Sequence, residues 1–149
     1  APTGRYDDNN LINVGKGFWT YMLTAGGTLY FDTEKTWYGS VLGNYEIHGK
    51  QDGTDITLGD DFTVEWSFGK IVKNVATIGI AGYAQWQITK DSGNAVSNKT
   101  QEIYAIGPEF DFIIDRNSGL SLSLRYLWEF GNKNRDDGSV FTIGLGFTI

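Results

Sequence analysis

Six charged residues stand at alternate positions within apolar stretches, where a strand would carry them all on one side. They are Glu46, Glu65, Glu109, Asp111, Arg125 and Glu129. In a narrow barrel such groups form a hydrogen-bonded interior, because a buried charge is tolerated only when it is paired. In a wider barrel they line a water-filled path that favours cations. We therefore predict that these six residues line a lumen, and we expect Arg125 to pair with Glu109 or Glu129.

The residues that could support catalysis or metal binding are few. The sequence has one histidine, His48, and no cysteine, so thiolate sites and disulfides are excluded. Glu46 lies two residues from His48 and would point to the same side of a strand. Together these two residues would make a weak metal site. Asp60 and Asp61 are adjacent and would point to opposite sides of a strand, so they cannot act as a carboxylate pair. With no phosphate loop, Ser-His-Asp set or dinucleotide fingerprint, we expect no enzymatic activity, no metal and no cofactor.

Charge and hydropathy restrict the partners. Lys and Arg number 12 against 18 Asp and Glu, a net charge of −6, which argues against a nucleic-acid partner. No run of about 18 apolar residues occurs, so a helical membrane span is excluded. The mean hydropathy of −0.28 is typical of a soluble protein. Membrane β-strands, however, expose apolar groups on one side only, and an average over the chain hides them.

Period-two alternation runs through seven segments of the chain, which indicates strands. The segments are residues 18–31, 37–48, 61–68, 77–89, 104–114, 120–130 and 141–149. One side of them, the aromatic face, carries most of the Trp, Phe, Leu and Ile residues, such as Trp37, Trp66 and Leu122. The other side, the polar face, carries Thr, Ser and the six charged residues. Most segments exceed the about five or six residues of a soluble strand and match the roughly nine to eleven that cross a bilayer.

The connections alternate in length and give a second test. Residues 32–35, 69–74 and 115–119 are short, whereas 49–55, 90–100 and 132–139 are longer and more polar. Outer-membrane barrels have short periplasmic turns and longer outer loops. We therefore predict an all-β fold, an antiparallel transmembrane β-barrel in an up-and-down meander. It has roughly seven or eight strands in this chain, with residues 1–149 as a single domain. At Pro108, which cannot donate to a ladder, we expect a bulge or local distortion.

The strand count suggests a larger barrel. If the C-terminus is periplasmic, the longer connections and residues 1–16 lie outside, and an odd number of strands leaves unpaired edges in lipid. We therefore expect one or more N-terminal strands to be missing; the alternative is a short strand within residues 1–11. Aromatic residues near the segment ends predict two girdles at the membrane surfaces. The outer girdle is Trp19, Tyr45, Trp86 and Trp128, and the periplasmic one is Phe31, Trp37, Trp66, Phe68 and Phe147.

The last segment matches the general signal for barrel assembly. That signal has a polar residue, a glycine two positions later, and two apolar residues at alternate final positions. Here these are Thr142, Gly144, Phe147 and Ile149. A terminal aromatic is more usual than Ile149. The match predicts that the barrel assembly machinery is a partner.

Four stretches resemble the outer-membrane family named for the meta-pathway of phenol degradation. They are residues 1–7 (APTGRYD), 82–89 (GYAQWQIT), 104–109 (YAIGPE) and 119–126 (GLSLSLRY). Members of that family are longer, and their Pro-Thr-Gly-x-Tyr-Asp segment follows an earlier strand, which also implies missing strands. The resemblance implies a transporter or channel linked to uptake of aromatic or other hydrophobic compounds. It carries over no catalytic residues.

From these features we expect a channel or transporter in the cell outer membrane of a Gram-negative bacterium, taking up small hydrophobic or aromatic solutes. Its expected partners are outer-membrane lipid, the assembly machinery and such solutes. Two alternatives stay open: a structural or adhesive barrel with a closed lumen, and a soluble calycin- or avidin-like ligand-binding barrel. In the soluble barrel the aromatic face would point inwards and the acidic residues outwards.

Overall fold

A computed structural model describes residues 4, 15–73, 75–94, 96, 98–115 and 118–147. Their fold is all-β, as the alternation predicts, and the seven predicted segments form seven strands. The strands are β1 (Thr20–Tyr30), β2 (Trp37–His48), β3 (Asp61–Val72), β4 (Ala76–Gln87), β5 (Glu102–Asp115), β6 (Leu120–Lys133) and β7 (Ser139–Gly146). Ile149 and nearly all of residues 1–14, where the alternative short strand was expected, lie outside the described residues.

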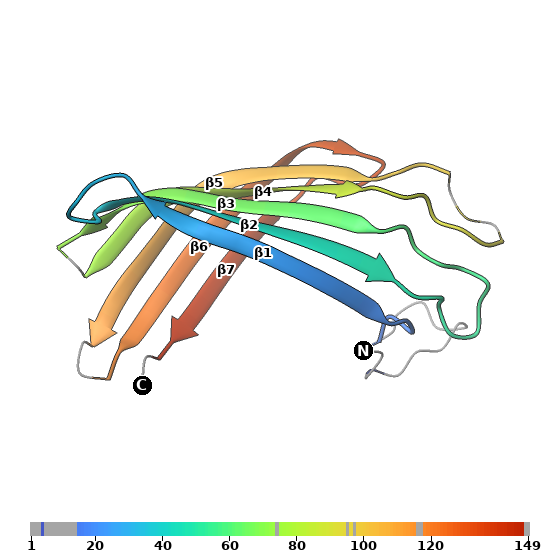
Figure 1. The fold of residues 1–149 in the computed structure, drawn as a ribbon, viewed down its shortest axis with the longest axis horizontal. Coiled ribbons are helices and arrows are strands. Elements are labelled where there is room, and N and C mark those ends of the chain that lie inside the picture. Colours follow the sequence, from blue (N-terminus) through green and yellow to red (C-terminus); the bar gives the residue numbers. More distant parts are fainter. Residues whose placement is uncertain are drawn as a thin grey trace.

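Each strand pairs antiparallel with the next along the chain, in a single sheet of order β1-β2-β3-β4-β5-β6-β7. The up-and-down meander is therefore confirmed (Figure 1). Within the described part of the chain, β1 and β7 are the two edges and do not pair with each other. None of the described residues forms a helix with the length and apolarity needed to span a membrane.

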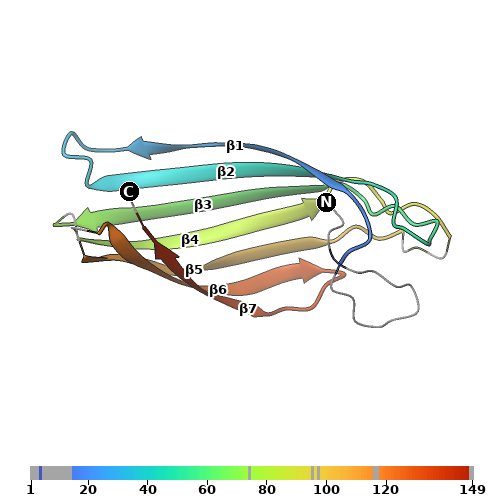
Figure 2. The ribbon, with the colours of Figure 1, turned by 90° about the horizontal axis from the view of Figure 1, so that it is seen from below.

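The connections gather at two ends of the sheet (Figure 2). Residues 31–36, 73–75 and 116–119 make the turns of one end, here called the short-turn end. Residues 49–60, 88–101 and 134–138 connect the strands at the other end, the long-loop end. The strand ends differ most from the expected bounds at two places, since β3 continues to Val72 and β6 to Lys133. These extensions shorten the turn after β3 and the connection after β6.

Pro108 interrupts one ladder without a bulge. The β5–β6 partners run from Ile106↔Trp128 to Glu109↔Arg125 in the same register, with no partner for Gly107 or Pro108. On its other side Pro108 pairs with Ile80 of β4 in an unbroken register. The register shifts of β5 fall near its two ends instead. The expected distortion is thus a local loss of pairing towards β6, as a missing N–H requires.

The sheet curves so that the polar face is concave. The Tyr38 hydroxyl on β2 reaches Glu109 on β5, and the Tyr83 hydroxyl on β4 reaches Glu129 on β6. Hydrogen bonds that skip a strand are possible only on the side towards which a sheet bends. The same face holds the small buried core, where Ala81, Ala105 and Leu127 pack together with Tyr83.

The aromatic face is convex and open. Its rings contact their neighbours across adjacent strands, as in the row Phe62–Trp86–Tyr104–Phe130 near the long-loop end. Near the short-turn end Phe68 packs against Phe31 and Trp37. Lys70 places its ammonium group 5.1 Å from the ring of Trp37. Two aromatic rows therefore lie near the two ends of the sheet. They include Trp86 of the expected outer girdle and Phe31, Trp37 and Phe68 of the expected periplasmic girdle, whereas Trp66 lies in the middle of β3.

Candidate functional site

All six predicted lumen residues lie on the polar face. Directly opposed residues on neighbouring strands point to the same side, and the register links Tyr38, Gly69, Gly79, Glu109 and Arg125 in one row. Glu46, Glu65, Asp111 and Glu129 are separated by even numbers of residues from members of that side on their own strands. The period-two assignment of these residues to one side of the sheet therefore agrees with the strand register.

Glu109 and Arg125 form the ion pair expected from the sequence. Arg125 donates its Nε–H to Glu109 Oε2 at 2.7 Å, and its Nη2 contacts the same oxygen. The Glu109 side chain is 6% exposed, whereas that of Arg125 is 36% exposed. Tyr38 adds its hydroxyl to the other oxygen, Glu109 Oε1, at 3.4 Å. A nearly buried carboxylate is thus held by a cation from the neighbouring strand β6 and a phenol from the more distant strand β2.

Glycines make the contact between Tyr38 and Glu109 possible. Gly69 and Gly79 occupy the two positions between them in the row. A Cβ atom on Gly69 would lie 2.9 Å from the Tyr38 hydroxyl and 2.9 Å from the Ile78 carbonyl oxygen. The ring of Tyr38 therefore lies directly over a stretch of wall without side chains, the glycine trough (Gly69 and Gly79).

The remaining predicted residues have different partners. Glu129 accepts a 2.5 Å hydrogen bond from Tyr83, not from Arg125. Glu65 lies 3.5 Å from the Asn44 side-chain amide. Glu46 stands opposite Asp61 in the register, which brings two carboxylates together on one face.

A cavity of about 270 Å³ opens on the polar face between two of these charges. Glu65 from β3 and Arg125 from β6 line it, together with the hydroxyl-bearing residues Thr28, Ser40 and Ser67. Thr28 and Ser40 are joined by a 2.8 Å hydrogen bond. The concave wall thus offers a polar hollow with both a carboxylate and a guanidinium group.

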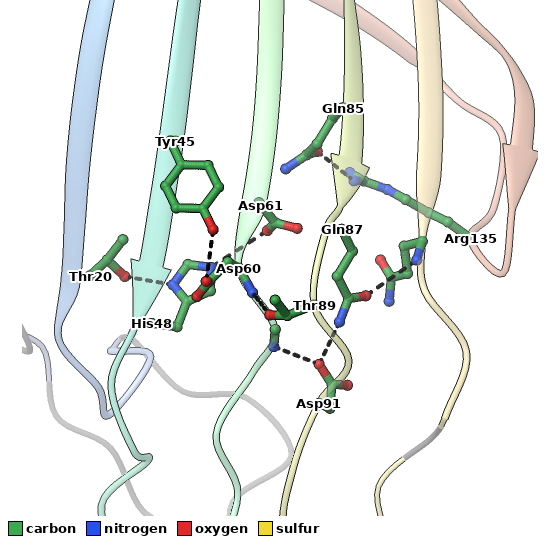
Figure 3. Close-up of polar contacts among 12 residues, drawn as sticks. Thr20, Tyr45, His48, Asp60, Asp61, Gln85, Gln87, Thr89, Asp91 and Arg135 are labelled. Atoms are coloured by element: carbon green, nitrogen blue, oxygen red, sulfur yellow. Dashed lines mark hydrogen bonds and ion pairs between the residues drawn. The ribbon is translucent and has the colours of Figure 1, made fainter.

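A network of polar contacts surrounds His48 at the long-loop end (Figure 3). His48 is 8% exposed. Its Nδ1 lies 3.1 Å from the Thr20 hydroxyl and its Nε2 3.5 Å from Asp61, while Phe18 packs edge-on against the ring. Asp60 points to the other face, where it accepts a 3.0 Å hydrogen bond from Tyr45. The opposite facing of Asp60 and Asp61 is confirmed, and no carboxylate pair forms.

The connections of the long-loop end are tied to one another. Asp91 accepts hydrogen bonds from the Gly59 N–H at 2.8 Å and from Gln87 at 2.6 Å. A Cβ atom on Gly59 would lie 1.9 Å from the Thr89 carbonyl oxygen, so only glycine fits this approach. Arg135 reaches from the β6–β7 connection to Gln85 at 3.2 Å. These contacts fix the edge of the concave face.

Lys50 and Asp55 make a further contact in the same end. Their side chains form a 2.6 Å ion pair. The hydrogen bond from the Lys50 ammonium group holds the pKa of Asp55 below its ordinary value. Because both side chains are well exposed, this pair orients the loop and adds little to stability.

The residues that sequence reasoning missed are the partners of the predicted charges. Tyr38 and Asp61 carry no separate signal, because their contacts depend on how far the sheet bends and on its register. His48 was considered only as part of a weak metal site with Glu46, and its burial was not predicted. Among the described residues, no group of three or more His, Asp or Glu side chains is arranged to hold a metal ion.

Part of the expected assembly signal is visible. Thr142 and Gly144 of β7 lie on the polar face, opposite Arg125 and Ser123 of β6. Phe147 follows β7 and is 71% exposed. Ile149 lies outside the described residues, so the signal stays a prediction as a whole.

Comparison with known proteins gives one family and one fold. The model of the family described as "Putative MetA-pathway of phenol degradation" matches residues 1–145. The crystal structure of an outer membrane channel from Pseudomonas putida F1 superimposes with a TM-score of 0.82 at 14% sequence identity. The superposition covers 97% of this chain and 54% of that one, so this chain spans about half the length of the solved channel. No curated protein matches the sequence.

Proposed function

The chain belongs to the family of the MetA-pathway of phenol degradation, and from that premise we propose that it forms part of the wall of an outer-membrane channel. Its polar face lines the solute path and its aromatic face contacts lipid. The expected class is a transporter of small solutes and not an enzyme. Its location in this proposal is the outer membrane of a Gram-negative cell, with the short-turn end on the periplasmic side.

One observation carries this proposal: the sheet exposes its apolar side chains and shelters its charged ones. Leu29, Phe141 and Leu145 of the aromatic face are 71%, 61% and 66% exposed, whereas Glu109 is 5% exposed. In water this arrangement is unfavourable, since each exposed large apolar side chain forgoes about 1.5–3 kcal/mol of burial. Against hydrocarbon it is favourable. The soluble pocket barrel requires rings inside and acids outside, which is the reverse of what the sheet presents.

The two edges of the sheet indicate a longer wall. In hydrocarbon each unpaired backbone group costs several kcal/mol, so β1 and β7 both need neighbouring strands. The outer membrane channel from Pseudomonas putida F1, which has the same fold, is about twice as long as this chain. We therefore propose that further strands close the barrel between β7 and β1.

The solutes we propose are small hydrophobic or aromatic compounds, in line with the family description. Carboxylates outnumber cationic groups among the strand residues described on the polar face, and Glu46 and Asp61 stand together near the long-loop end. This balance favours cations among charged permeants. The second candidate is a barrel whose lumen is closed and whose role is structural, and the contacts that pair the charges of the polar face with one another favour it.

Conductance separates the two candidates. We expect the purified outer-membrane protein that contains this chain to give discrete current steps in planar lipid bilayers. In a KCl gradient, the reversal potential should have the sign expected of a cation-selective pore. Glu46→Gln should reduce that potential, and Thr24→Val, an uncharged change on the same face, should leave it unchanged. A membrane-inserted protein without conductance would establish the structural role.

A further inference from the structure

An apolar hollow interrupts the polar face near the short-turn end. It has a volume of about 290 Å³. We call it the inner-end pocket, and its lining includes Ile71, Val75, Thr77, Asp111, Ile113 and Ser121. Its residues on β5 and β6 lie two to four positions from the Glu109–Arg125 pair, and it shares no lining residue with the cavity beside Arg125.

The apolar lining is exposed on the concave side. Ile71, Thr77 and Asp111 are joined in one row of the register, and Ile113 stands opposite Ser121 in the next. Ile113 is 44% and Val75 37% exposed. The pocket therefore presents two branched side chains to the interior of the curve, where its neighbours are hydroxyls and carboxylates. A concave apolar surface with a few convergent polar groups is the usual form of a small-molecule site.

Asp111 gives this pocket a specific polar contact. Glu109 and Glu129 on the same face have hydrogen-bond donors. By contrast, no hydrogen bond or ion pair within the described part of the chain reaches the Asp111 carboxylate, whose row neighbours are the uncharged Thr77 and Ser123. A carboxylate beside apolar groups gains most from a donor brought by a ligand, because charge-assisted hydrogen bonds are roughly twice as strong as neutral ones.

We propose that the inner-end pocket binds a small uncharged solute that is mostly apolar and carries one hydroxyl donor. The apolar body contacts Ile71, Val75 and Ile113, and the hydroxyl donates to Asp111. This inference rests on the proposed channel function and assigns a binding step to it. An anionic solute is excluded from the pocket because its charge would meet that of Asp111.

Isoleucine methyl groups provide the test. The protein, labelled at the δ1 methyl groups of isoleucine and held in lipid nanodiscs, is titrated with benzyl alcohol and, separately, with toluene. We expect saturable shifts at Ile71 and Ile113 and only linear shifts at Ile80 and Ile143, which face lipid. Benzyl alcohol should bind about fivefold more tightly than toluene, the margin of one charge-assisted hydrogen bond that competes with water.

A matched variant tests the role of the carboxylate. Asp111→Asn keeps the shape and weakens the acceptor, so it should remove most of the preference for benzyl alcohol over toluene. Glu65→Gln, the same change outside the pocket, should preserve it. The signals of Ile80 and Ile143 report whether each variant is folded. If Asp111→Asn does not fold, Ile113→Thr takes its place, and it should weaken the Ile71 response to both compounds.

Two outcomes would overturn the inference. One is a linear response at Ile71 and Ile113 like that of the lipid-facing methyl groups. The other is an unchanged preference for benzyl alcohol in Asp111→Asn. Current steps in planar lipid bilayers are measured on the same preparation. Current steps without saturable binding would reject the pocket and keep the channel, whereas saturable binding without current steps would reject the channel and keep the pocket.

Discussion

The two faces of this sheet have opposite relations between polarity and exposure. On the aromatic face, Leu23 and Phe141 are 67% and 61% exposed. On the polar face, Glu109 is 5% exposed, and Ala81 next to it in space is fully buried. Both faces belong to the same seven strands, so composition or strand propensity cannot explain the difference. The difference is the one that the proposed channel requires, with hydrocarbon on the convex side and a polar interior on the concave side.

The largest expected effect comes from placing one cation on each face in turn. Leu124→Arg puts a guanidinium group on the aromatic face, further inside β6 than its first turn-proximal residues, and the cost of a cation near the bilayer midplane is about 2–4 kcal/mol. Ser123→Arg puts the same group on the polar face, opposite Asp111, and should be nearly neutral. Assembly is measured as the heat-modifiable fraction in outer membranes. Equal tolerance of the two changes would contradict the assigned facing.

The second effect concerns charges within the polar face. Glu109→Gln removes the partner of Arg125 and should lower the unfolding free energy by about 1–3 kcal/mol, less than for a fully buried pair because Arg125 is partly exposed. Glu65→Gln is the matched control, since Glu65 has only the long 3.5 Å contact with Asn44. Urea unfolding in lipid vesicles gives both values. A cost for Glu65→Gln as large as that for Glu109→Gln would mean that the ion pair does not organise the wall.

The third effect compares glycines on opposite faces. A methyl group on Gly69 would meet both the Tyr38 ring and the Ile78 carbonyl, and overpacking of this kind costs about 1–3 kcal/mol. Gly27 on the aromatic face has nothing within 4 Å of the position that a Cβ would take. Gly27→Ala should therefore be neutral or slightly stabilising in the same unfolding assay. A larger loss for Gly27→Ala than for Gly69→Ala would show that the trough is not occupied by Tyr38.

The smallest effect lies at the short-turn end, outside both faces. Asp32 accepts hydrogen bonds from the Thr36 hydroxyl at 2.5 Å and from the backbone N–H groups of Thr36 and Trp37 at 2.8 and 2.9 Å. These bonds, that of the Thr36 hydroxyl first, hold the pKa of Asp32 below its ordinary value of 3.8. The stabilisation is therefore complete above that ordinary value and is lost as the pH falls through the lowered pKa.

The rate of cleavage of the β1–β2 turn by an acid protease, divided by the rate for a free peptide of the same sequence at the same pH, measures this effect. The ratio should rise as the pH falls below the ordinary Asp32 pKa of 3.8. For Asp32→Asn the ratio should be nearly independent of pH. If Asp32→Asn keeps the pH profile of the unchanged protein, the titration of another group causes the change in cleavage.

The sequence predicts which face a side chain occupies better than it predicts which side chains contact each other. Alternation assigns Glu109, Arg125 and Glu129 to one side, because side-chain direction in a strand depends only on local position. Which carboxylate Arg125 selects depends on the β5–β6 register, so two partners stayed open until the structure placed Glu109 opposite it. The reach of Tyr38 to Glu109 depends on the bend of four strands, for which no local pattern exists.

The ends of strands were also harder to predict than their centres. Residues 69–74 contain Gly69 and Lys70, which are typical of a turn, yet the ladder with β4 continues to Val72. Ile71 thereby becomes part of the inner-end pocket, which the sequence did not indicate. At the long-loop end, Asp91 contacts Gly59 of another connection and Arg135 contacts Gln85 of β4. These partners are far apart in sequence, so composition alone predicted only loops there.

The ion pair of Glu109 and Arg125 has a consequence for the order in which the wall is made. Its members stand on β5 and β6, neighbours joined by a single turn, so the two charges can neutralise each other as soon as that hairpin forms. The contribution of Tyr38 comes later, since it requires β2 to β5 to lie side by side. A hairpin that carries its own counter-charge can approach a bilayer without exposing a lone ion to it. The charge of Glu109 is thus compensated within one hairpin before the barrel exists.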